Sequence, residues 1–124
     1  MPLRHDIPIA SDLVFVTGHG PITATEGASL ARQVLADVRL APEFGMLVRL
    51  GEVESEVRAQ DAEPAKGAAA DLKARGLRRA AIVAADDHGF EFGREVAASA
   101  RRFGLAMEVF RDDIEAVTWL LDDG

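Results

Sequence analysis

Four short apolar runs recur along the chain at nearly even intervals. They are Leu13 to Thr17, Met46 to Leu50, Ala80 to Ala85 and Ala106 to Phe110, each bordered by residues typical of turns. Their starts lie about 26 to 34 residues apart, the length of a strand, a helix and two loops in a right-handed crossover unit. This spacing predicts a mainly parallel sheet. The alternating segment Leu3 to Ile9 predicts an additional antiparallel strand at one edge.

The segments between these runs change to the three- and four-residue period of helices. In residues 23 to 38, Leu30 and Val34 mark one face, and Thr23 and Glu26 have the spacing of a capping box. A further helix is predicted from about Pro64, after a loop. Between the third and fourth apolar runs, a stripe predicts a helix that ends at Gly104, a glycine suited to a left-handed stop. The stripe consists of Phe92, Val96, Ala100 and Phe103.

The last helix is predicted to begin after Asp112, a residue type that caps helix N-termini. At about 100° per residue, Ile114, Val117 and Leu121 share one side, which we expect to face the sheet. Trp119, the only tryptophan, then points away from it. Two interpretations of Trp119 remain open: packing beside the third helix, or a surface used by a partner.

These elements predict a single α/β domain over residues 1 to 124, with a mixed, mainly parallel sheet of about five strands and about four helices. The predicted core takes one or two inward positions from most elements. It comprises Val14, Val16, Leu30, Val34, Leu47, Ile82, Val96, Phe103, Val109 and Ile114.

Charge and composition narrow the classes of function. The net charge is −7, and acidic residues outnumber basic ones in both halves, which argues against nucleic-acid binding. The chain has no cysteine, so thiol chemistry, thiolate metal sites and disulfides are excluded. No apolar run approaches the length of a membrane span, and the first twelve residues lack the apolar stretch of a signal peptide. We therefore expect a cytoplasmic protein.

Three phrases in this order resemble the SpoIIAA-like group of the STAS superfamily, which is also similar to the lipid-binding CRAL-TRIO (Sec14-type) domains. They are "LVFVTGHGPIT", "AAIVAADDHGFEFG" and, most specifically, "VFRDDIEAVTWL". The resemblance covers nearly the whole chain. It implies a mixed sheet with helices packed around it and, by analogy with the better-known relatives, a regulatory binding module.

The chain departs from that pattern at two places. Anti-sigma-factor antagonists of the superfamily carry a phosphorylatable serine in an Asp-Ser-x-Gly setting, and that tetrapeptide is absent here. Ser55, between two glutamates, is the nearest candidate phosphosite, but a phosphate there would meet local repulsion, and a plain loop serine is the simpler interpretation. Arg49 stands where many relatives carry an acid, so no acidic role is transferred.

Two loops carry candidate site residues. His19 lies between two glycines in "GHGPIT", just before a helix start, where backbone N–H groups can bind an anion; the alternative is a tight turn. Asp86, Asp87 and His88 follow the third run, at the edge where parallel sheets usually build their sites. They could ligate a metal, but three successive side chains seldom converge, and capping of the next helix is the alternative.

Phe90 completes the candidate surface. Phe90 and Phe92 cannot both enter the core from one helix, so one of them is free to line a crevice or to pack under a loop. No metal or cofactor is predicted, since no set of ligands has a suitable spacing.

The leading hypothesis is a non-catalytic regulatory or binding module that acts through a protein partner or an apolar, lipid-like small molecule. The alternative is a small enzyme or metal-assisted site built from His19, Asp86, Asp87 and His88, which requires the two histidines to meet. A homodimer held by exposed apolar surface is a third interpretation, compatible with the first.

Overall fold

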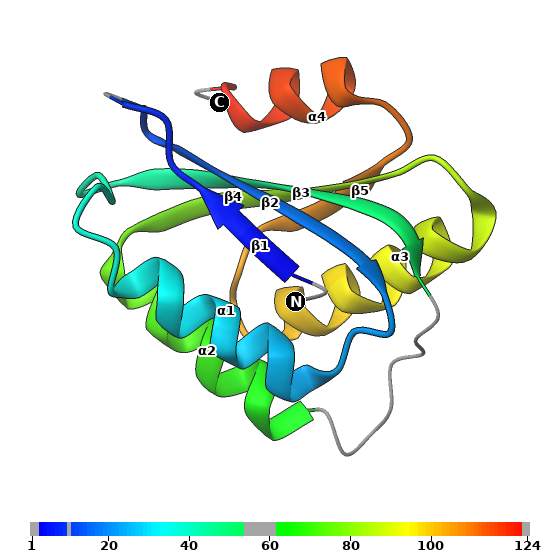
Figure 1. The fold of residues 1–124 in the computed structure, drawn as a ribbon, viewed down its shortest axis with the longest axis horizontal. Helices are drawn as coiled ribbons and strands as arrows, with labels where there is room; N and C mark the ends of the chain where they lie inside the picture. Colours follow the sequence, from blue (N-terminus) through cyan, green and yellow to red (C-terminus); the bar gives the residue numbers. More distant parts are fainter. Residues whose placement is uncertain (1–2, 10, 54–61, 123–124) are drawn as a thin grey trace.

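The computed structural model describes residues 3–9, 11–53 and 62–122. These residues form five strands and four helices, and strands and helices alternate from β2 onward (Figure 1). The strands are β1 (Leu3–Asp6), β2 (Leu13–Gly20), β3 (Phe44–Val53), β4 (Leu77–Ala84) and β5 (Met107–Phe110). The helices are α1 (Ala24–Leu35), α2 (Ala62–Arg75), α3 (Asp87–Arg102) and α4 (Asp113–Leu120). The predicted α/β class and mixed sheet are confirmed.

The strands lie in the sheet in the same order as in the chain, β1-β2-β3-β4-β5. β1 pairs antiparallel with β2, and the other three pairs are parallel. Because each parallel connection steps in the same direction and such crossovers are right-handed, α1, α2 and α3 all lie on one face of the sheet. Of the described helices, α4 is the one on the opposite face (Figure 1).

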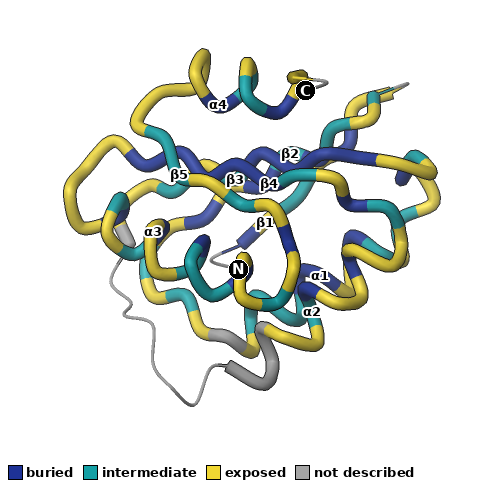
Figure 2. The backbone as a smooth tube through the Cα atoms, turned by 180° about the vertical axis from the view of Figure 1, so that it is seen from behind, coloured by how far each residue is buried: buried dark blue, intermediate teal, exposed yellow. Residues whose placement is uncertain are grey.

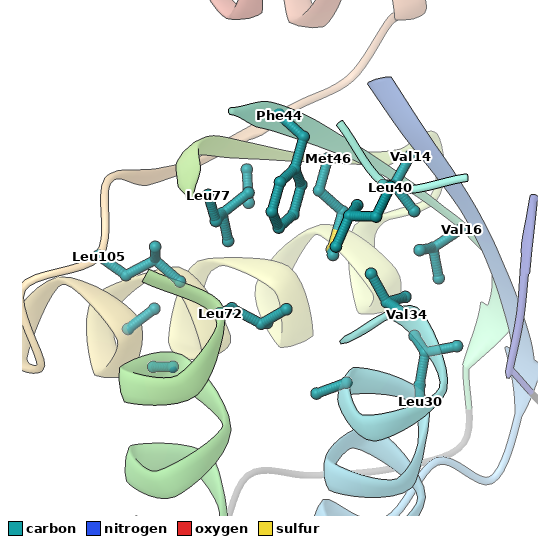
Figure 3. Packing of buried hydrophobic residues seen from close by; sticks show 14 of the residues in the cluster. Val14, Val16, Leu30, Val34, Leu40, Phe44, Met46, Leu72, Leu77 and Leu105 are labelled. Atoms are coloured by element: carbon teal, nitrogen blue, oxygen red, sulfur yellow. The ribbon is translucent and has the colours of Figure 1, made fainter. Parts of the chain in front are cut away.

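The larger core lies between the sheet and helices α1 and α2 (Figure 3). Phe44 of β3 and Val34 of α1 are both completely buried there, and Leu72 of α2 and Leu77 of β4 pack in the same cluster. Of the ten predicted core residues, six are buried: Val14, Val16, Leu30, Val34, Leu47 and Ile82. Val96, Phe103 and Val109 are only half-buried, and the prediction for Ile114 is wrong because its side chain is 79% exposed.

The smaller core lies under α4 and consists of Leu47, Ala81, Val83, Ala116 and Leu120. α4 therefore faces the sheet with Ala116 and Leu120, not with the predicted stripe. Ile114 and Leu121 lie about 120° to 140° around the helix from that direction and are exposed. The small side chain of Ala116 lets the helix backbone approach the sheet closely. This close approach stabilises the observed orientation more than burial of the larger residues Ile114 and Leu121 would.

α3 also packs through a different side than predicted. Its buried residues are Gly89, Gly93, Ala97 and Ala100, and Phe92 and Val96 are half-buried. A Cβ added to Gly93 would lie 3.0 Å from Val109 Cγ2 and 3.1 Å from Ile82 Cγ2. The helix is therefore close to β4 and β5, and only very small residues fit in between.

The predicted helix caps and the predicted helix stop are confirmed. The Thr23 and Glu26 capping box is present, Asp112 caps α4 and accepts from the Glu115 N–H, and Gly104 has a left-handed φ of 84°. β2 is longer than predicted and continues to Gly20, and α2 begins two residues before Pro64.

A polar cluster joins the edge strand β1 to the loop after α1. Asp37 Oδ2 lies 3.0 Å from His5 Nε2 and 2.7 Å from Arg39 Nη2, and its side chain is only 12% exposed. Arg39 also donates to the Ile7 carbonyl at 3.2 Å. Hydrogen bonds from the side chain and backbone of Arg39, and then from His5, hold the pKa of Asp37 well below its usual value.

We expect Asp37→Asn to lower the melting temperature at neutral pH, because the amide keeps the shape but loses the charge-assisted hydrogen bonds. The lowered pKa means that the charged carboxylate stabilises the folded state above the unfolded pKa of about 4 and loses this effect as the pH falls further. The melting temperatures of the wild type and the variant should therefore converge in acid. A difference that stays constant from pH 7 to about pH 2 would contradict this assignment.

Candidate functional site

Arg111 contacts several residues at the start of α3. It follows β5, donates to the Ala85 carbonyl at 3.2 Å, and pairs with Asp87 Oδ1 at 2.9 Å. Its guanidinium carbon lies 4.3 Å from the centre of the Phe90 ring. Phe90 is half-buried beneath this cation, so the arginine ties the loop after β5 to the loop after β4.

The neighbouring acids have structural partners. Asp86 caps α3, accepting from the Gly89 N–H at 2.7 Å. The side chain of Asp87 is 93% exposed, so its pair with Arg111 is of the solvated kind that contributes little stability. His88 lies exposed in the first turn of the helix.

A hollow of about 440 Å³ lies between α3 and the edge strand β5. Phe90 is at one end, Ala97, Ala98 and Val109 contribute apolar surface, and five charged residues complete the lining: Glu91, Arg94, Glu95, Arg101 and Glu108. Two ion pairs cross this surface, Arg94 with Glu91 at 3.0 Å and Arg101 with Glu108 at 3.5 Å. We call this hollow the α3–β5 groove.

The backbone of β5 opens onto the groove. The Ala106 carbonyl accepts from Ala80 of the neighbouring strand at 2.9 Å, whereas the Met107 carbonyl accepts from the Arg101 side chain at 2.9 Å. The carbonyl of Ala106 therefore points toward β4, and that of Met107 points away from the sheet. By this period of two, the N–H and C=O of Val109 point away from the sheet, toward the space where a further strand would lie.

The two candidate histidines lie on opposite faces of the sheet. A Cβ added to Gly51 would lie 3.5 Å from the Cβ of His19, so His19 shares the face of Arg49, whose side chain pairs with Asp113 of α4 at 3.1 Å. His88 belongs to α3, which packs on the other face. The arrangement required by the alternative enzyme hypothesis, with His19 and His88 in one site, is not present.

The remaining candidates from the sequence are a metal site and the phosphosite Ser55. Among the described residues, no three His, Cys, Asp or Glu side chains lie close enough together to hold a metal ion. Ser55 lies outside the described residues.

Trp119 packs on the sheet, on the face opposite α3, so both the predicted outward orientation and the predicted position beside the third helix are wrong. Its ring centre lies 5.7 Å from that of Phe110 at an angle of 48°, and the guanidinium carbon of Arg79 lies 5.1 Å from it. Arg79 also donates to the Trp119 carbonyl at 2.6 Å. The arginine thus holds both the indole and the C-terminal end of α4, where a cation is favourable.

We expect Trp119→Ala to reduce the free energy of unfolding by about 2 kcal/mol, less than for a completely buried tryptophan because the indole is only half-buried. Arg79→Lys should cost less, since it keeps the charge but loses planar stacking. Chemical denaturation of both variants measures this. An unchanged stability of Trp119→Ala would contradict a packing role.

The arginines that organise these surfaces, Arg79 and Arg111, were not among the sequence candidates. Arg79 lies near the start of β4, and Arg111 follows the end of β5. This position at the end of a strand is the only feature of the sequence that could have pointed to either residue. The partners described above are about 21 to 40 residues away in the chain, so spacing alone does not reveal them.

No family model matches the chain, and neither does any curated protein. A solved structure does: an uncharacterised protein of the DUF3478 family with a SpoIIAA-like fold, from Shewanella loihica PV-4. The match has a TM-score of 0.61 at 17% identity and covers 95% of this chain and 93% of the other. The fold is SpoIIAA-like. The resemblance seen in the three sequence phrases is thus confirmed at the level of the SpoIIAA-like fold, and none of the helices in the described ranges is long and apolar enough to cross a membrane.

Proposed function

We propose that this SpoIIAA-like domain is a non-catalytic regulatory module that binds a protein partner by accepting an extended segment of it along β5. The observation that carries the proposal is the outward-pointing backbone of Val109 beside the α3–β5 groove. An added strand obtains affinity from main-chain hydrogen bonds and specificity from pockets for alternate side chains.

The lining of the groove favours a peptide over an apolar small molecule. Five of its nine residues are charged, and they come from both α3 and β5. Sites for apolar ligands are concave and lined mainly by hydrophobic side chains. A partner segment that carries both charged and small apolar residues fits a lining in which Glu91, Arg94 and Glu95 stand beside Ala97, Ala98 and Val109 better.

The test is to fill the groove. Ala98→Arg places a long side chain on the groove wall, and Ala70→Arg makes the same change at an exposed position of α2 as the matched control. We expect a protein captured from cell extract by the wild type to be lost with Ala98→Arg and retained with Ala70→Arg, while both variants melt like the wild type.

Hydrogen exchange then locates the contact. Once the captured protein is identified, its segment added to the purified chain should slow exchange of the Val109 amide and leave exchange of β1, at the other edge of the sheet, unchanged. Capture that survives Ala98→Arg, or protection confined to other elements, would refute the proposal.

A further inference from the structure

The outer side of α4 exposes large apolar side chains next to the polar residues Glu115 and Thr118. Ala116 and Leu120 face the sheet, and Val117 and Trp119 are half-buried on its two flanks. Ile114 and Leu121 point to solvent and are 79% and 58% exposed. Large apolar side chains exposed together at one place on the surface mark an interaction surface.

The face of the sheet that carries α4 has room for a second helix. Five strands span about 19 Å at their usual spacing, and one helix is about 10 Å across. α4 packs on β3, β4 and β5. Figure 2 shows α4 on this face and the other described helices on the opposite one. Thr17 and His19 of β2 and Arg4 of β1 are exposed on the face of α4. Arg4 shares the face with Thr17 because the two residues pair directly across the antiparallel strands.

We propose that a second copy of this chain covers this face, with the α4 helices of the two copies side by side between the two sheets. Each α4 then packs with Ala116 and Leu120 on its own sheet and with Ile114 and Leu121 on the β1–β2 half of the other copy. Half-buried Leu13 and Phe15, which border the cluster under α4, supply the apolar part of that surface, beside exposed Thr17, His19 and Arg4. The contact is isologous, as in most homodimers.

Charge favours a second copy as the occupant. The outer side of α4 bears exposed Glu115 and, at its start, exposed Asp112, whereas the β1–β2 half bears exposed Arg4. Asp6 of β1 shares that face, but it is paired with Arg39 at 3.3 Å. A two-fold axis places the acidic side of each α4 near Arg4 of the other copy. The interface is separate from the α3–β5 groove, so neither proposal depends on the other.

The first test is sedimentation velocity across a concentration series. We expect the wild type to form dimers, and Ile114→Glu and Leu121→Glu each to raise the dissociation constant about tenfold or more with an unchanged monomer melting temperature. Val38→Glu, at an apolar residue that is 99% exposed between α1 and β3, is the control and should dimerise normally. A monomeric wild type, or a dimer insensitive to both α4 variants, overturns the proposal.

The second test maps the contact and uses the absence of cysteine from the chain. Copies carrying Thr17→Cys on the β1–β2 half, mixed with copies carrying Thr118→Cys on the outer side of α4, should form a disulfide-linked heterodimer on mild oxidation. Thr25→Cys, exposed on α1 at the opposite face, should not link to Thr118→Cys. Linking through Thr25→Cys with equal yield, or no linking through Thr17→Cys, contradicts this arrangement.

Discussion

Replacing Gly76 with alanine should lower the free energy of unfolding by about 3 kcal/mol or more. Gly76 follows α2 with a φ of 132°, a backbone conformation that other residues rarely adopt. A Cβ there would overlap the backbone carbonyl of Pro42. Relief requires movement of the segment before β3, whose first residue, Phe44, donates its N–H to the Gly76 carbonyl at 3.0 Å.

Gly20→Ala is the matched control, because it separates backbone strain from overlap. Gly20 also has a positive φ, 71°, but no atom lies within 4 Å of an added Cβ. This variant should cost only about 1 kcal/mol. Chemical denaturation compares the two, and equal losses would mean that the overlap with Pro42 is unimportant.

A leucine at Gly93 should cost about 3 kcal/mol, because it forces α3 away from β4 and β5. The methyl groups of Val109 and Ile82 would already lie closer to an added Cβ than ordinary van der Waals contact, and three more carbons have no space. The displacement would also distort the α3–β5 groove, so partner capture should fall with stability. Urea denaturation gives the size of the loss.

Gly27→Leu provides the comparison within α1, where nothing lies within 4 Å of an added Cβ. Leucine has the higher helix propensity, so this variant should be neutral or up to about 0.8 kcal/mol more stable. If Gly93→Leu behaved in the same way, the close approach of α3 to the sheet would be disproved.

The order and direction of the elements could be predicted because the strands appear as short apolar runs at the spacing of crossover units, most clearly β4, whose last five residues are all buried. Helix ends were predictable where a side chain caps its own helix, as Thr23 and Asp112 do. Both signals depend on residues close together in the sequence, so they do not depend on how the helices pack in the fold.

The packed sides of α3 and α4 could not be predicted from apolar periodicity. In both helices the contact is made by the smallest residues, such as Gly93 and Ala116, which carry little hydrophobic signal. The side that packs is the one that lets the helix backbone approach the sheet most closely. This distance depends on the side chains of both the helix and the sheet, so the helix sequence alone does not reveal it. The larger residues Ile114 and Leu121 then remain outside.

The candidate surface was predictable only in position. Asp86, Asp87, His88 and Phe90 do lie at the carboxyl end of β4, as the topology requires, but their arrangement depends on Arg111 from beyond the next strand. The assignment of His19 to the same site failed because β2 continues to Gly20 and sets the histidine on the other face.

The agreement between strand order and chain order has a consequence for synthesis on the ribosome. Each of β2 to β5 finds its sheet neighbour in the segment made just before it, so no nascent strand waits for a later partner. The sheet can grow from β1 outward as the chain emerges, and α4 adds the final layer once β3, β4 and β5 are in place.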